Sequence, residues 1–191
     1  MSPAERPGGD RHRAERAARR LALAAIFEAE FGQRTAPAIL ERHLAESEGD
    51  PATAEFARRL VAVTVERRDR IDELLGRLAP QYPVVQLARI DRALLRTAIG
   101  EVLHSATTPA RVAIAEWVEL ARIYSGEPAR RLVNGVLGRI ARGGVAAGAG
   151  PEAIAPATSG PGADESEPEE GVSGHDLRAT QEDRRRAARR R

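Results

Sequence analysis

Apolar side chains recur along the chain at the three- and four-residue spacing of amphipathic helices. Residues 112–140 show this pattern twice, and a turn between the two halves contains a glycine and a proline. In the first half, Glu116, Glu119 and Arg122 lie opposite the apolar band. Such carboxylates are typical of a solvated or salt-bridged face rather than of acid–base catalysis. The segment therefore predicts a helical hairpin whose apolar faces need further helices to cover them.

The remaining helices are predicted from the same periodicity together with capping residues, prolines and glycines. We expect them at residues 10–31, 36–46, 51–79 and 89–104, with a short turn headed by Pro83. Asp10, Asp50 and Thr108 are the expected caps. Segment 89–104 is apolar around most of its circumference, which predicts a buried helix. No stretch alternates with a period of two, so the predicted fold class is all-α.

The composition limits the chemistry that the chain can perform. Of its 191 residues, 42% are apolar and only 3% aromatic, so the core must consist of Leu, Val, Ile and Ala. There is no cysteine and no lysine, and all 30 basic residues are arginine, which a coding bias explains. Thiolate nucleophiles, Schiff-base lysines and P-loop lysines are therefore excluded. The four histidines lie on separate segments, so we expect no metal site, no cofactor and no enzymatic activity.

The two ends of the chain differ in composition from its centre. Residues 1–9 are a polar lead-in, and residues 143–191 are rich in Gly, Ala and Pro, then acidic, then rich in arginine. With few large apolar side chains, both are expected to be disordered. Residues 143–191 carry seven arginines against nine acidic residues, whereas the whole chain carries +2. The predicted helical domain, residues 10–142, is therefore more basic than the total suggests.

The basic N-terminal segment precedes an apolar stretch, as in a signal peptide. Glu28 interrupts that stretch after seven residues, and no cleavage site follows. No stretch is long enough to span a membrane. We expect a cytoplasmic protein without a membrane partner.

The predicted helix at residues 10–31 carries a candidate RNA-binding face. Arg13, Arg16 and Arg20 project from one side at successive turns, a spacing with which guanidinium groups can follow a phosphate backbone. Phe27 lies further along the same line and could stack on an unstacked base. The alternative is a face that only keeps the protein in solution.

Three ordered segments resemble the NusB family of bacterial transcription antitermination factors. They are the arginine-rich helix, RIDRALLR at residues 89–96, and VAIAEWVELAR followed after the turn by LVNGVLGRI. The resemblance covers roughly residues 13–142. It implies about seven helices in two packed sub-bundles. It also implies binding of single-stranded boxA-like RNA, pairing with the ribosomal protein NusE, and action in an RNA polymerase antitermination complex during ribosomal RNA synthesis.

The resemblance adds residues to the candidate sites. Arg111, Arg130 and Arg131 match family positions that extend the RNA surface, and Asp91 with Arg92 matches the charged pair that docks NusE. Without the family, Asp91 is explained equally well as a cap or salt bridge at the start of its own helix. The chain departs from the family pattern at Ala24, Ala115, Pro128 and Leu132, and the last two bear on the RNA contacts.

Two other functions are compatible with the sequence. One is a helical protein–protein adaptor that does not bind RNA. The other is the N-terminal part of an rRNA cytosine methyltransferase, which would need a catalytic domain with a nucleophilic cysteine. The resemblance is also compatible with a homodimer, since some relatives pair.

Overall fold

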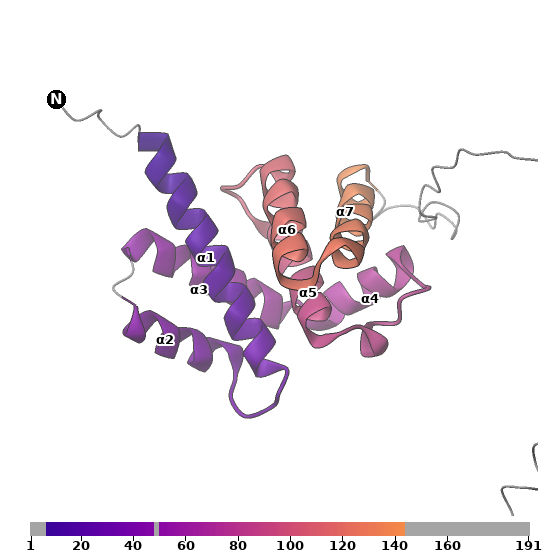
Figure 1. The fold of residues 1–191 in the computed structure, drawn as a ribbon, viewed down its shortest axis with the longest axis horizontal. Coiled ribbons are helices and arrows are strands. Elements are labelled where there is room, and N and C mark those ends of the chain that lie inside the picture. Colours follow the sequence, from indigo (N-terminus) through magenta and orange to yellow (C-terminus); the bar gives the residue numbers. More distant parts are fainter. Residues whose placement is uncertain (1–6, 48–49, 144–191) are drawn as a thin grey trace, which may run out of the picture. The chain divides into compact units, whose positions relative to one another are not determined.

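The computed structural model describes residues 7–47 and 50–143, and all of its regular secondary structure there is helical (Figure 1). This confirms the predicted all-α class. The elements are α1 (Pro7–Ala29), α2 (Ala36–Glu46), α3 (Pro51–Glu66), α4 (Arg68–Leu78), the 3₁₀ turn η1 (Val84–Gln86), α5 (Arg89–His104), α6 (Ala110–Ser125) and α7 (Glu127–Ala141). The expectations for residues 144–191 lie outside the described part.

The helices form two groups that meet at α5. Helices α1, α2 and α3 pack on one another, while α6 and α7 form an antiparallel hairpin that packs on α5, with α4 beside α5 and α7 (Figure 1). Helix α5 also contacts α1 and α3, so it joins the two groups. Residues 93–101 of α5 are all buried, as its apolar circumference predicted.

The core consists of aliphatic side chains from every α-helix, with Trp117 as its largest fully buried member. Alanines at 18, 22 and 25 let α1 approach its neighbours closely. A Cβ atom added at Gly100 of α5 would lie 3.3 Å from Thr64 Oγ1 and 3.4 Å from Val63 Cγ1. Glycine at this position therefore allows α5 and α3 to pack at short range.

Helix α1 begins earlier than predicted. It starts at Pro7, where a missing backbone N–H costs nothing, so residues 7–9, which were expected in the lead-in, are helical. Asp10 lies in the first turn instead of capping the helix, and residues 1–6 lie outside the described part. At its other end, the amides of Glu30 and Phe31 donate to carbonyls three residues back. This tighter last turn accounts for the predicted end near Phe31.

The predicted long helix at residues 51–79 is two helices. The chain breaks at Arg67, which has φ −104° and ψ 8°, and its amide donates to the carbonyls of Val63 and Val65. Helix α3 packs on α1, α2 and α5, whereas α4 packs on α5 and α7. The break therefore redirects the chain from one helix group to the other without changing the apolar spacing.

The expected caps at Asp50 and Thr108 form only in part. Asp50 occupies the N-cap position of α3 as predicted, but its side chain accepts no capping hydrogen bond, and the N-cap of α6 is Pro109 rather than Thr108. The predicted turn between α6 and α7 is present. Gly126 adopts φ 86°, a left-handed conformation that favours glycine, and its amide donates to the carbonyls of Ala121 and Arg122.

Candidate nucleic-acid interface

The three predicted arginines of α1 lie together on an exposed face. Arg13, Arg16 and Arg20, with His12 one turn before Arg16, line a shallow groove of about 370 Å³. Arg13 Nη1 lies 3.5 Å from Asp10 Oδ1. Arg20 makes no hydrogen bond or ion pair with the other described residues. The face is therefore cationic and open to a ligand.

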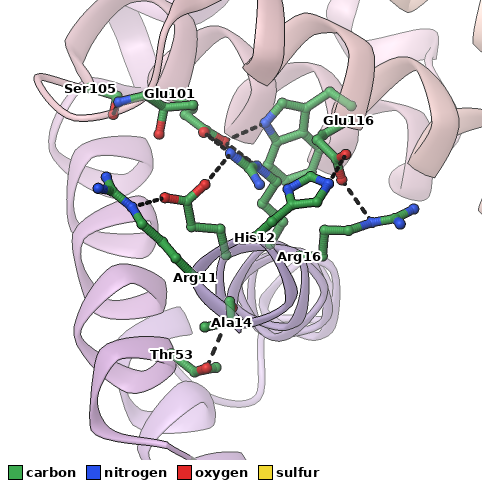
Figure 2. A network of polar contacts seen from close by, with 12 residues as sticks. Arg11, His12, Ala14, Arg16, Thr53, Glu101, Ser105 and Glu116 are labelled. Atoms are coloured by element: carbon green, nitrogen blue, oxygen red, sulfur yellow. Dashed lines mark hydrogen bonds and ion pairs between the residues drawn. The ribbon is translucent and has the colours of Figure 1, made fainter. Parts of the chain in front are cut away.

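Helix α6 contributes a carboxylate to this face. Glu116 Oε2 lies 3.0 Å from Arg16 Nε, and Glu116 Oε1 lies 3.5 Å from His12 Nε2 (Figure 2). His12 and Arg16 are four residues apart on α1, so one carboxylate spans one helical turn. This confirms that Glu116 belongs to a salt-bridged face, as its spacing predicted.

A second cluster of charges lies at the junction of α6 and α7. Arg122 donates to Glu119 Oε1 at 2.6 Å and Oε2 at 2.9 Å, and Arg130 Nε donates to both oxygens of Glu127 at 2.8 Å. Hydrogen bonds from Arg122 lower the pKa of Glu119, and the charges of Arg16 and Arg130 lower it further against a burial effect that raises it. Arg16 of α1 and Arg130 of α7 therefore lie within electrostatic range of one α6 carboxylate.

Arg131 extends this cluster along α7. Its charge contributes, after the hydrogen bond and charge of Arg130, to a lowered pKa of Glu127. The side chain is exposed and forms no hydrogen bond or ion pair with the described residues. We call the combined set from α1, α6 and α7 the arginine surface: Arg13, Arg16, Arg20, Arg122, Arg130 and Arg131.

Two predicted RNA-binding residues have different surroundings. Phe27 is half-buried against the core, and its ring meets Phe31 edge-on with 5.4 Å between centroids. Phe31 is the more exposed ring, at 53%, and the Arg89 guanidinium lies 4.7 Å from its centroid. Arg111 is exposed in the first turn of α6, at the opposite end of that helix from Arg122.

The predicted protein-docking pair, Asp91 and Arg92, lies at the start of α5. Arg92 Nε donates to Glu30 Oε2 at 2.9 Å, and its Nη1 donates to the Val84 carbonyl at 3.2 Å, so this guanidinium serves internal contacts. Asp91 is partly exposed, and its Oδ1 is buried without a hydrogen-bond partner among the described residues. Nearby Val85 is 85% exposed.

A buried polar centre beneath the arginine surface is not predicted by the sequence analysis. Arg19, on the inner side of α1, donates through Nε and Nη2 to Glu101 of α5, and Trp117 Nε1 of α6 donates to Glu101 Oε2 at 2.7 Å (Figure 2). The helical register of Arg19 is the one signal in the sequence that could have indicated this buried site. Arg19 precedes Leu23 by four residues and Ile26 by seven, so it shares their buried side.

The described residues contain no cluster of three or more histidine and acidic side chains suited to a metal ion. His43 illustrates why: its neighbours are Glu28 and Arg42, and a cation beside the ring disfavours a metal. Nor is any helix in residues 7–47 and 50–143 long and apolar enough to cross a bilayer.

The fold and the site define an all-helical domain with a cationic surface on α1, α6 and α7. Known proteins similar to this chain belong to the same class. The model of the NusB family matches residues 16–142. The chain is 39% identical over 127 residues to the transcription antitermination protein NusB of Dehalococcoides mccartyi, covering 66% of this chain and 89% of the relative. It is 40% identical over 147 residues to the NusB of Symbiobacterium thermophilum, covering 73% and 96%. The chain therefore belongs to the NusB family.

Solved structures show the same fold. A structure of T. maritima NusB, 34% identical, superposes with a TM-score of 0.63 over 67% of this chain and 90% of that one. A complex of the antitermination factors NusB and NusE with double-stranded RNA gives a TM-score of 0.60 at 21% identity, over 69% of this chain and 98% of that one. At that identity the second likeness concerns the fold alone.

Proposed function

We propose that the chain is a transcription antitermination factor that binds boxA-like single-stranded RNA through its arginine surface, together with the ribosomal protein NusE. It would act in the cytoplasm, within an RNA polymerase antitermination complex during ribosomal RNA synthesis. The observation that carries the proposal is that exposed arginines from two helices far apart in sequence lie beside α6: Arg16 of α1 contacts Glu116, and Arg130 and Arg131 follow the turn that joins α6 to α7. Guanidinium groups on separate elements can contact successive phosphates of one strand.

The partners follow from the family and from its solved members. Relatives matched over 89% and 96% of their length are named as antitermination proteins, which favours this function over the methyltransferase alternative. One structure of this fold holds NusE and RNA together. In this chain the partly exposed Asp91 is the candidate contact for NusE. A homodimer would compete with either ligand if it covered the same faces.

The adaptor without RNA binding remains a second candidate, because one specific observation favours it. Glu116, Glu119 and Glu127 already pair with arginines of the surface. These carboxylates reduce the positive potential that a phosphate backbone meets.

Binding measurements distinguish the two functions. We expect a boxA-like single strand to bind more tightly than a scrambled strand or a duplex, with affinity that falls as salt rises. NusE should strengthen binding to the boxA-like strand. If none of the three RNAs binds at low salt, with or without NusE, the adaptor is the correct function.

A further inference from the structure

Glu116 differs from the other carboxylates of the arginine surface because it bridges two helices. It extends from α6 to His12 and Arg16 of α1, and its side chain is only 14% exposed (Figure 2). Glu119 and Glu127 instead pair with arginines three residues away, and are 40% and 50% exposed. Glu116 therefore fixes the position of an α1 arginine relative to α6.

The geometry of the contact leaves Arg16 available to a ligand. Glu116 approaches Arg16 at Nε, and Figure 2 shows the two terminal nitrogens turned away from the carboxylate. The other carboxylate oxygen lies toward His12, which favours a contact through Nε alone. The Arg16 side chain is 45% exposed, so its terminal nitrogens can donate to a phosphate while Nε stays paired.

We infer that Glu116 is a positioning residue for RNA binding: it holds Arg16 in the orientation in which the terminal nitrogens receive a phosphate. This inference rests on the proposed function. A free arginine loses rotamer freedom when it binds, and a side chain already held in place loses less. A negative charge beside the phosphate site would then increase RNA affinity, although charge alone predicts the opposite.

The sign of this effect provides the test. Glu116→Ala and Glu119→Ala remove the same charge from the same helix one turn apart, and electrostatics alone predicts tighter RNA binding for both. We expect Glu119→Ala to tighten binding of a boxA-like strand roughly twofold. Glu116→Ala should weaken it roughly threefold to tenfold, the cost of ordering one released arginine. Binding by Glu116→Ala as tight as wild type, or tighter, overturns the inference.

A double-mutant cycle separates positioning from general packing. In the Arg16→Ala background there is no arginine for Glu116 to hold, so adding Glu116→Ala should leave RNA affinity equal or slightly higher. If Glu116→Ala weakens binding equally in both backgrounds, Glu116 has a packing role and the inference fails. Thermal unfolding of each variant shows whether it is folded under the binding conditions.

A measurement without RNA tests the contact itself. The ¹⁵N order parameter of Arg16 Nε should be higher in the wild type and in Glu119→Ala than in Glu116→Ala, because only Glu116→Ala releases the Arg16 side chain. Equal order parameters in all three proteins would show that Glu116 does not hold Arg16. Absence of RNA binding by the wild type would overturn the proposed function, and the inference with it. Normal wild-type binding with an unaffected Glu116→Ala variant would overturn only the inference.

Discussion

Arg19 and Glu101 form a buried ion pair that joins α1 to α5. Arg19 Nε donates to Glu101 Oε1 at 3.2 Å and Oε2 at 3.0 Å, and Nη2 donates to Oε1 at 2.6 Å, with both side chains fully shielded from solvent. Trp117 of α6 donates to the same carboxylate, so three helices meet at Glu101. Because α1 carries Arg16 on its outer side, this contact also fixes the helix that presents the arginine surface.

Neutralising the carboxylate should destabilise the protein strongly. Glu101→Gln leaves Arg19 charged in a buried site. The only carboxylate then near it among the described residues is Glu15, whose Oε2 lies 3.9 Å from Arg19 Nη2, and Nη1 lacks a partner there. We expect the free energy of unfolding to fall by about 3 kcal/mol, measured by urea denaturation. Glu41→Gln, which breaks the exposed pair of Glu41 with Arg58, is the matched control and should have a small effect.

The double variant Arg19→Met with Glu101→Gln tests the origin of that loss. It removes the buried charge and retains an amide oxygen for Trp117, so it should recover much of the stability lost in Glu101→Gln. If the double variant is instead less stable than Glu101→Gln, the packing of the Arg19 side chain stabilises the protein more than the ion pair does. The stability lost in Glu101→Gln would then not come from an unpaired buried charge.

His104 should make stability depend on pH near neutrality. Partial desolvation of the largely exposed His104 side chain, followed by the charge of Arg67, lowers the pKa of this imidazole below its usual 6.5. The unfolded chain therefore binds the proton more readily, so stability is greatest above 6.5 and declines as pH falls toward the lowered pKa. Urea midpoints of His104→Gln should change less than wild type between about pH 7.5 and 5.5. Equal changes of the urea midpoint in both proteins would show that His104 is not the source of the pH dependence.

Asp91 should affect partner binding without affecting RNA binding. Asp91→Asn keeps the size of the side chain but removes the charge, and we expect NusE affinity to fall by about 1.5 to 3 kcal/mol, as for a charge-assisted hydrogen bond. The RNA affinity of the variant, measured without NusE, should stay close to that of the wild type, since Asp91 lies outside the arginine surface. We also expect NusE to strengthen RNA binding, and by linkage RNA must then strengthen NusE binding by the same factor. Calorimetric titrations of each ligand, alone and with the other present, measure both quantities.

Most of the fold could be predicted from the sequence. At most helix ends, the apolar spacing stops at the same place as a proline or glycine that interrupts a helix. Gly126 with Pro128 defined the α6–α7 turn, and the prediction for residues 36–46 coincides with α2. The break at Arg67 could not be predicted. Its backbone angles stay near the helical region and no breaker residue marks it. Only the packing of α3 on α1 and α2, and of α4 on α7, reveals the break.

The candidate site was predictable in part. Spacing on one helix placed Arg13, Arg16 and Arg20 on a common face, which the structure retains. The contact of Arg16 with Glu116 joins residues one hundred positions apart, and no local pattern encodes it. The same holds for Arg19 with Glu101, because a charged residue in an apolar register identifies a buried site but not its partner.

The salt dependence of RNA binding tests the arginine surface most directly. Arg20→Ala and Arg131→Ala each remove an exposed guanidinium that pairs with no described residue, so each should weaken binding of a boxA-like strand. Each should also reduce the slope of log affinity against log salt by about 0.7, the value for one phosphate contact on a single strand. Arg70→Ala, an exposed arginine in the first turn of α4, is the control and should leave affinity and slope unchanged. If Arg20→Ala and Arg131→Ala bind RNA with the same affinity and slope as Arg70→Ala, the arginine surface is not the RNA site.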